Sequence, residues 1–253
     1  MHMRGMAITR LVSFFGGLAL AANLTMAQQT VAPTPTLLEL YTSQGCSSCP
    51  PADKLIKSYA KRRDIVALSF NVDYWDYLGW KDTLAKREYS NRQRTYAMKR
   101  GDGEVYTPQI VVNGVTHAVG SMRRRINRAI SVANTRSKKP NVPLTVVHKN
   151  GKLTVKVGGD QPVALPRSAT VWLATVRSKV TVPVKRGENH GRTLTYYNVV
   201  DKLTPIGMWS GKQTVIELMD EDVLQGKADN CAVLIQLGKG GPIVAARWMS
   251  TSS

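Results

Sequence analysis

Two cysteines separated by two residues, Cys46 and Cys49, are the feature that most constrains the fold of this chain. The apolar run at residues 37–41 predicts a buried strand before the pair, and the apolar periodicity of residues 52–63 predicts a helix after it. A second apolar run at 65–72 predicts another buried strand. A strand, a helix and a strand in succession favour a right-handed unit with parallel strands. The sequence therefore predicts an α/β fold with the cysteines where a strand turns into a helix.

This placement points to thiol–disulfide chemistry. The spacing lets the two sulfurs approach disulfide distance, and the free N–H groups and dipole at a helix N-terminus stabilise a thiolate. Because the thiolate is the species that attacks a disulfide, we expect Cys46 to be an exposed nucleophile and Cys49 the resolving thiol. An inert structural disulfide is the alternative. The chain has no second C-x-x-C and no His-x-x-x-His, which argues against zinc, and we expect no metal and no cofactor.

A proline near the third predicted strand gives a second clue. Thr107-Pro108 leads into an apolar run at residues 109–112. A proline there can be cis, and its missing N–H leaves neighbouring groups free for an extended substrate segment. We predict that Pro108 is part of the catalytic site and that Thr107, Ser47 and Ser48 line the substrate groove. The alternative is an ordinary trans proline at a sheet edge.

An aromatic loop follows the second predicted strand. Ligands of open α/β sheets collect beyond the carboxyl ends of strands, where the cysteine turn also lies. Asp73, Trp75 and Trp80 are therefore candidates for a wall of the groove. A packed aromatic cluster is the alternative, and we favour it.

Three further side chains have two interpretations each. Glu39, if buried, could accept the proton of Cys49 during resolution, whereas the alternative is a glutamate exposed at a sheet edge. His117 could join the cysteines as a copper ligand, although a single strand histidine is more often structural. Cys231 precedes Ala-Val-Leu-Ile and is predicted to be a small buried apolar residue rather than a reactive thiol.

The second half of the chain has a different pattern. Beyond residues 137–143 the helical periodicity disappears, and short alternating runs with turn signals follow, among them 169–178, 180–185 and 193–200. Such runs predict an antiparallel sandwich. We therefore predict an α/β domain at residues 28–138 and an all-β domain at 139–253.

The first 27 residues have the pattern of an export signal. Arg4 and Arg10 are basic, residues 11–22 are mostly apolar, and small residues at 25–27 offer a cleavage site. The apolar run is short for a membrane span, and an uncleaved anchor is the alternative. We expect a periplasmic or secreted protein in an oxidising compartment, where a close cysteine pair persists as a disulfide.

The chain is strongly basic, with 35 Lys and Arg against 17 Asp and Glu and a net charge of +18. Such a charge favours anionic surfaces. Arg123, Arg124 and Arg125, with Lys138 and Lys139, are predicted to be solvated and could hold the protein peripherally to an anionic envelope surface. No motif that reads nucleic acid accompanies them, so we expect no nucleic-acid partner.

Long motifs resemble the family DUF1223, a group of secreted thioredoxin-like proteins. They are LELYTSQGCSSCPPAD (38–53), VDYWDYLGWKD (72–82), YTPQ (106–109), VNG (112–114), GENHGRTL (187–194) and NVV (198–200). The resemblance implies a thioredoxin-like fold with a β-rich extension and no established reaction. In the thioredoxin pattern, Cys46 and Cys49 match the redox pair and Pro108 matches the cis-proline that faces it. The chain departs from that pattern in Ser47-Ser48 between the cysteines and in lacking a tryptophan before Cys46, which leaves the redox potential and direction open.

Together these features predict an exported thioredoxin-like thiol–disulfide oxidoreductase whose partners are protein thiols and disulfides of the cell envelope. Two alternatives remain open. One is a non-catalytic envelope binding protein whose disulfide only staples a loop, and the other is a copper-handling module.

Overall fold

The computed structural model describes residues 1–2, 34–136, 142–224 and 226–251. The predicted export signal, apart from its first two residues, and the predicted boundary between residues 138 and 139 lie outside this part of the chain. Residues Ala32–Ser253 form one compact unit. No helix in the described ranges is long and apolar enough to cross a membrane.

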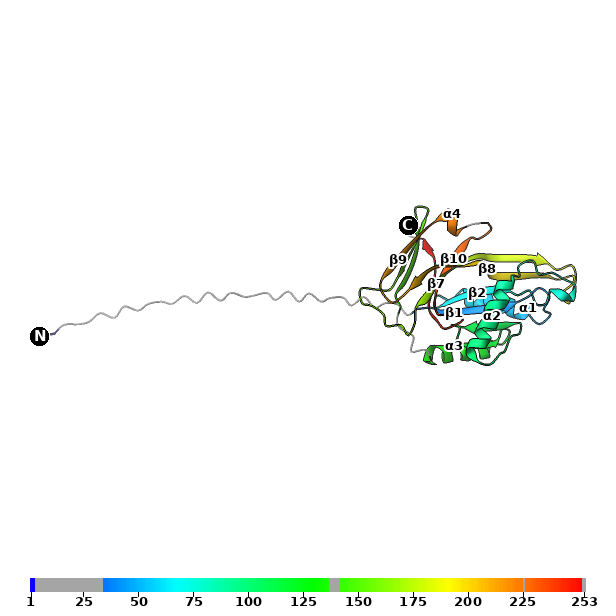
Figure 1. Ribbon diagram of the computed structural model, residues 1–253, viewed down its shortest axis with the longest axis horizontal. Coiled ribbons are helices and arrows are strands. Elements are labelled where there is room, and N and C mark those ends of the chain that lie inside the picture. Colours follow the sequence, from blue (N-terminus) through cyan, green and yellow to red (C-terminus); the bar gives the residue numbers. More distant parts are fainter. Residues whose placement is uncertain (3–33, 137–141, 225, 252–253) are drawn as a thin grey trace. The chain divides into compact units, whose positions relative to one another are not determined.

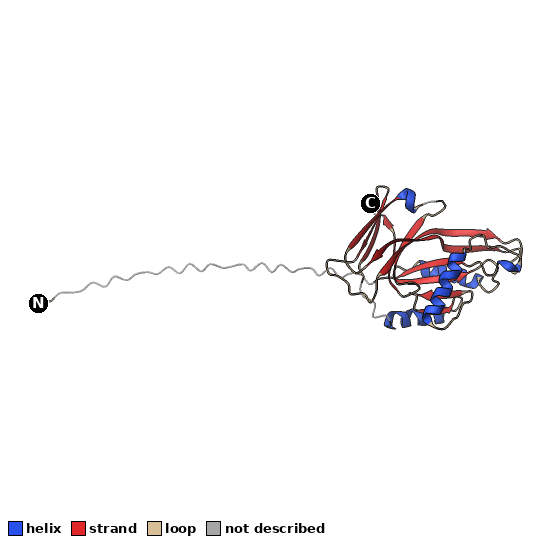
Figure 2. Ribbon diagram, in the orientation of Figure 1, coloured by secondary structure: helices blue, strands red, loops and turns tan. Residues whose placement is uncertain are grey.

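Strands outnumber helices in this unit (Figures 1 and 2). In chain order the elements are β1 (Thr36–Thr42), α1 (Pro50–Ala60), β2 (Ile65–Asn71), the 3-10 helix η1 (Asp76–Leu78), α2 (Arg87–Arg100), β3 (Gln109–Val112), β4 (Thr116–Val119), α3 (Arg123–Arg136), β5 (Leu144–Lys149), β6 (Lys152–Val157), β7 (Ala169–Pro183), β8 (Thr193–Trp209), β9 (Thr214–Met219), α4 (Asp220–Val223), β10 (Asn230–Leu237), β11 (Ile243–Trp248) and β12 (Ser250–Thr251).

The strands form two mixed sheets. The larger has eight strands in the order β11-β10-β7-β8-β2-β1-β3-β4, and the smaller has four in the order β12-β5-β6-β9. As predicted, β1 and β2 are parallel, while β3 pairs antiparallel with β1 and with β4. The fold is therefore mixed α/β.

Helices cover both faces of the β1–β3 part of the large sheet because successive side chains of a strand point to opposite faces. Leu38 and Leu40 of β1 pack in one buried cluster with α1 and α3. Leu37 and Tyr41 pack in another with Tyr89 and Tyr96 of α2. With apolar side chains on both faces, β1 is buried along its whole length.

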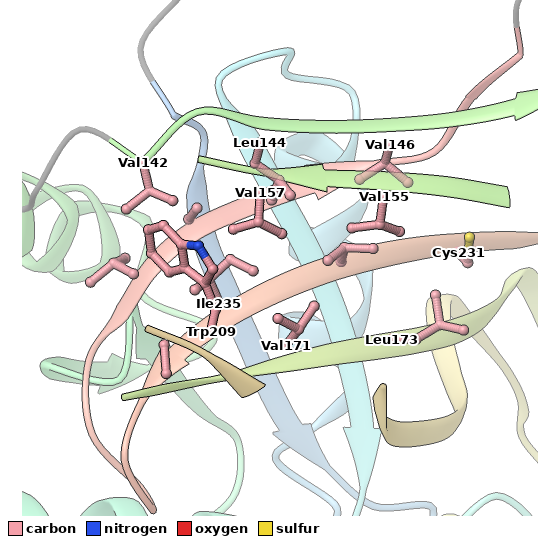
Figure 3. Close-up of a cluster of buried hydrophobic side chains, with 14 of the residues drawn as sticks. Val142, Leu144, Val146, Val155, Val157, Val171, Leu173, Trp209, Cys231 and Ile235 are labelled. Carbon is pink, nitrogen blue, oxygen red and sulfur yellow. The ribbon is translucent and has the colours of Figure 1, made fainter. Parts of the chain in front are cut away.

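The strands of the second half do not form a sandwich of their own. Strand β8 lies parallel to β2, with Ser69 opposite Val199, so β7, β8, β10 and β11 extend the sheet that begins with β1. The small sheet packs on one face of this extension, where Val146 and Val155 meet Leu173, Cys231 and Ile235 (Figure 3). The alternating pattern predicted the strands, but it carries no information on which sheet each strand joins.

Strands β7 and β8 form one long hairpin (Figure 1). The two runs predicted at 169–178 and 180–185 are a single strand, and the run predicted at 193–200 continues to Trp209. At the outer end of the hairpin, Val182 and Tyr196 share a buried cluster with Leu84. This contact brings the hairpin tip to the side of the molecule that carries the cysteine turn.

Candidate functional site

The cysteine pair lies in the predicted turn between β1 and α1. Cys46 and Cys49 are joined by a disulfide, with their Cα atoms 5.4 Å apart. Cys49 is the N-cap residue of α1, and its carbonyl accepts hydrogen bonds from the N–H groups of Ala52 and Asp53 at 2.8 and 3.1 Å. Pro50 follows at the first helical position, where a missing N–H costs nothing.

The expectation of an exposed Cys46 is wrong for this oxidised form. Cys46 is 3% exposed and Cys49 is 0% exposed, whereas Ser47 and Ser48 between them are exposed. The sulfur of Cys46 lies 3.4 Å from the hydroxyl oxygen of Ser48. A partner can therefore reach the turn at its two serines but not at the sulfurs themselves.

The segment at residues 184–192 joins β7 to β8 and is hydrogen-bonded to the cysteine turn, and we call it the cover loop. The side-chain amide of Asn189 donates hydrogen bonds to the carbonyls of Gln44 and Cys46, both at 2.9 Å. The carboxylate of Glu188 accepts the N–H of Ser47 at 3.2 Å. Asn189 is fully buried, so these bonds fix the cover loop on the cysteine turn.

Sequence reasoning missed the cover loop as part of the site. The sequence feature that could have indicated this loop is the motif at 187–194, which contains Gly187 and Gly191. Both glycines have positive φ in the structure. Such backbone favours glycine and marks a shaped turn. Nothing local in the sequence connects that turn to cysteines more than 130 positions earlier.

Trp75 connects the cysteine turn to the Pro108 loop. Its indole N–H donates to the hydroxyl of Thr107 at 2.7 Å. A Cβ on Gly45 would lie 3.1 Å from the Cβ of Trp75, so the backbone before Cys46 packs directly on this tryptophan. The structure thus brings together two of the predicted groove residues, Trp75 and Thr107, through a hydrogen bond.

Pro108 lies beside the first turn of α1. The peptide bond between Thr107 and Pro108 is cis, as the sequence allowed. A Cβ on Gly120 would stand 3.1 Å from the Cβ atoms of both Pro108 and Ala52, so Gly120 packs against both side chains. Pro108 is buried, which places it behind the turn rather than on an open surface.

The other two aromatic-loop candidates differ in their contacts. Trp80 donates its indole N–H to the side-chain carbonyl of Gln44 at 2.8 Å, which supports the cysteine turn. Asp73 accepts a 2.5 Å hydrogen bond from Ser90 of α2 and lies 3.7 Å from Arg87. Among the described contacts none joins Asp73 to the cysteines.

An open depression of about 590 Å³ lies beside the cysteine turn. Its lining comes from the cysteine turn, α1, the end of the cover loop and the start of β8, and consists of Ser47, Pro50, Pro51, Lys54, Arg192, Thr193 and Leu194. Both charged members of the lining are cations. This surface was not foreseen, because β8 was not expected to lie beside α1.

A buried carboxylate lies one helical turn after Cys49. Asp53 is 3% exposed, and its Oδ1 atom accepts a 2.7 Å hydrogen bond from Thr42. Burial raises the pKa of Asp53 to about 8, and the nearby Asp82 carboxylate acts in the same direction. The same two carboxylates add to the effect of burial in raising the pKa of Tyr196. Sequence reasoning missed Asp53, although its position four residues after Cys49 was a usable signal.

Glu39 is buried and not exposed at a sheet edge, but its partner is an arginine and not a cysteine. It is fully buried, and its carboxylate pairs with Arg92 of α2 at 2.7 Å. Because α2 and α1 cover opposite faces of the sheet, this ion pair lies across β1 from the helix that carries Cys49. No described contact joins Glu39 to a cysteine, and Asp53 is the carboxylate on the cysteine side.

The remaining candidates lie apart from the cysteine pair. His117 contacts Tyr106 at 2.9 Å and Asp102 at 3.4 Å, and burial, together with Arg100, lowers its pKa. The described residues contain no group of three or more His, Cys, Asp or Glu side chains arranged to hold a metal. Cys231 is in the apolar core between the sheets, as predicted, and burial raises its pKa to about 12 (Figure 3).

The comparisons with known proteins agree with this architecture. The family model "Protein of unknown function (DUF1223)" matches residues 37–236, and the chain belongs to this family. The crystal structure of protein AGR_C_4864 from Agrobacterium tumefaciens is similar, with 33% sequence identity and a TM-score of 0.74 over 86% of this chain and 94% of that one. HBP35 of Porphyromonas gingivalis shares the fold at 12% identity, with a TM-score of 0.57 over 87% of this chain and 76% of that one. No curated protein matches the sequence.

Proposed function

We propose that the protein is an exported thioredoxin-like thiol–disulfide oxidoreductase that acts on disulfides of envelope proteins. The observation that carries the proposal is a disulfide at the N-terminus of α1 with Pro108 beside the same helical turn. We also propose that the first half of the chain is thioredoxin-like and that the second half is a β-rich extension of it. Its support is the strand order β2-β1-β3-β4 with α1 and α3 on one face and α2 on the other.

The exchange reaction needs no cofactor. In the reduced protein, the Cys46 thiolate attacks one sulfur of a partner disulfide, that disulfide breaks, and the departing partner sulfur takes up a proton. The Cys49 thiolate then attacks the Cys46 sulfur and releases the second partner thiol. The protein leaves with the Cys46–Cys49 disulfide, and the partner has gained two electrons and two protons. The reverse sequence oxidises a partner dithiol.

Asp53 fits the proton transfer of the second step. The Cys49 thiol must lose its proton before it can attack, and an efficient base has a pKa near the working pH. Burial places the pKa of Asp53 at about 8, which meets that condition. The carboxylate belongs to the residue whose N–H donates to the Cys49 carbonyl, so both groups occupy the first turn of α1.

Access to the sulfurs requires movement of the cover loop. The sulfur of Cys46 is buried in the oxidised form, and three hydrogen bonds connect the loop to the cysteine turn. We propose that a partner segment enters the depression at Ser47 and Pro50 and displaces Glu188 from the Ser47 N–H. The cations Lys54 and Arg192 in that depression favour a partner segment with acidic residues beside its disulfide.

The experiment is a glutathione-coupled insulin reduction assay. Wild-type protein is expected to accelerate insulin reduction, and Cys46→Ser is expected to abolish the acceleration. Cys49→Ser is expected to accumulate a mixed disulfide through Cys46, visible as a shift on non-reducing gels, and Cys231→Ala serves as the matched control. Equal rates for wild type and Cys46→Ser would end the proposal.

A second candidate is a non-catalytic binding protein in which the disulfide only staples the turn. The burial of both sulfurs favours it. The reduction potential separates the two functions: a value below about −300 mV is typical of structural disulfides, whereas a less negative value is typical of exchangeable ones. Titration against glutathione and dithiothreitol buffers measures it.

We also propose that the protein is exported and attaches peripherally to an anionic surface of the cell envelope. The exposed side chains of Arg123, Arg124 and Arg125 at the start of α3 support the attachment. Cell fractionation tests both: the proposal expects the protein in the periplasm or medium, with a salt-extractable fraction on membranes. Recovery only with the cytoplasm would contradict it.

A further inference from the structure

A second concave site lies on the opposite side of β1 from the helix that carries Cys49. Helix α2 covers β1 and β2 on its face of the large sheet, but it leaves β7, β8 and β10 partly uncovered. The resulting groove has a volume of about 950 Å³, at the upper end of the range for small-molecule sites.

The floor of this groove is apolar, and the strand register explains why. Trp172 of β7 lies opposite Pro205 of β8 and Leu234 of β10, while the next row places Thr170 opposite Met208 and Gln236. Residues opposite each other in a sheet present their side chains on the same face. Met208, in the groove lining, is 63% exposed, and Met98 on the α2 wall is 71% exposed.

The groove is closed at one end. A Cβ on Gly240 would stand 2.4 Å from Cγ2 of Thr95, so the turn between β10 and β11 packs directly on α2. Both residues belong to the groove lining. An elongated molecule can therefore enter between α2 and β8 and end against this contact.

The charge of the lining is positive. Arg94, Lys202 and Lys239 line the groove as exposed cations, and none of them forms an ion pair with another described residue. Glu88 is the acidic member of the lining. Arg92 contributes no free charge, because its guanidinium is paired with Glu39 and lies 5.8 Å over the Trp172 ring.

We propose that this groove binds an amphipathic carboxylate, a small molecule with an elongated apolar body and one anionic group. Its apolar body lies on Trp172 and Met208, and its carboxylate meets the free cations of the rim. A peptide strand is a poorer fit, because β7, β8 and β10 are inside the sheet and their main-chain groups are used in pairing. The site is independent of the proposed redox chemistry.

Isothermal titration of the full chain with sodium octanoate, decanoate and dodecanoate, below micelle formation, tests the proposal. Each added methylene that becomes buried is expected to tighten binding by about fourfold. Dodecanol is expected to bind more weakly than dodecanoate, and dodecyltrimethylammonium more weakly still. Affinity that is independent of chain length would mean only anion adsorption to a basic protein and would overturn the proposal.

Variants locate the site. Met208→Glu places a carboxylate on the exposed floor and is expected to weaken dodecanoate binding by about tenfold or more. Lys202→Glu is expected to weaken it as well. Met122→Glu is the matched control, because Met122 is an exposed methionine outside the groove lining, and it is expected to leave affinity unchanged.

Two results would refute the site. One is an equal effect of Met208→Glu and Met122→Glu on dodecanoate binding. The other is binding to phosphatidylglycerol vesicles or acidic peptides without binding to dodecanoate. Cys46→Ser should bind dodecanoate like wild type.

Discussion

The side-chain amide of Asn189 donates a hydrogen bond to the main-chain carbonyl of Cys46 at 2.9 Å, across 143 positions of sequence. This bond makes the second half of the chain part of the cysteine site. The same amide also holds the carbonyl of Gln44, and Arg192 holds the other end of the Asn189 side chain at 2.9 Å. The surroundings of the disulfide therefore include a loop that belongs to the β7–β8 hairpin.

Replacing Asn189 by alanine should expose the disulfide. The substitution leaves the Gln44 and Cys46 carbonyls without their partner, and the loss of such buried bonds costs about 1–3 kcal/mol. The cover loop will open more often, so dithiothreitol should reduce the disulfide roughly tenfold faster. Maleimide labelling after timed reduction measures the rate. His190→Ala, an exposed neighbour in the same loop, is the control and should react like wild type. An unchanged rate in Asn189→Ala would show that the loop does not limit access.

Asp53 should make stability depend on pH. The folded state holds its proton up to about pH 8, whereas the unfolded chain releases it near the ordinary pKa of about 3.9. Because the folded state binds more protons in this window, the free energy of unfolding falls as pH rises from about 4 to about 8. Asp53→Asn removes this contribution and should be more stable than wild type by several kcal/mol at about pH 9, with a smaller difference at about pH 5.

Urea unfolding at the two pH values measures this effect. Asp64→Asn is the control, because Asp64 is exposed and its pKa is lowered by Arg62, so its titration lies below the window. A wild-type profile that Asp53→Asn leaves unchanged would show that Asp53 is ionised in the folded protein.

The sequence predicted the parts of the fold that follow from local pattern. The strand at Gln109–Val112 has the predicted bounds, and the turn with Cys46 and Cys49 lies between a strand and a helix as expected. The pairing of Ser69 with Val199 could not be predicted, because an apolar strand fits either sheet and no local residue selects its neighbour. The hydrogen bond between Asn189 and Cys46 could not be predicted for the same reason, since the two residues lie 143 positions apart in the sequence.

Glu39 also shows that local sequence does not predict which distant element a side chain contacts. Strand alternation predicts that Glu39 and Tyr41 share a face of the sheet. In the structure Glu39 forms an ion pair with Arg92, and Tyr41 packs in one cluster with Tyr89 and Tyr96. All three of these contacting residues belong to α2. Which helix covers that face is decided by the chain path, not by the strand. The buried carboxylate on the α1 side is that of Asp53, whose position four residues after Cys49 can be read from the sequence.

The buried pair of Glu39 and Arg92 should be sensitive to the loss of one partner. Glu39→Gln leaves the Arg92 guanidinium, which is 10% exposed, without its counter-charge and should destabilise the protein by about 3–5 kcal/mol. The double variant Glu39→Gln, Arg92→Met removes both charges and should recover most of that loss. Chemical denaturation of wild type, the single variants and the double variant measures the coupling. Additive effects of the two substitutions would show that the pair contributes no specific interaction.

The thiol of Cys231 should stay unreactive when the disulfide is reduced. Burial between the two sheets raises its pKa to about 12, so almost no thiolate forms near neutral pH, and the side chain is 0% exposed. Brief reduction followed by Ellman's reagent should therefore titrate two thiols in the native protein, those of Cys46 and Cys49, which the proposed movement of the cover loop exposes, and a third only after unfolding. Cys231→Ala should give the same native titre as wild type, and Cys49→Ala should give one thiol. A native titre that falls in Cys231→Ala would mean that the core opens at this strand on the timescale of the reaction, and the redox assays would then need Cys231→Ala as their reference protein.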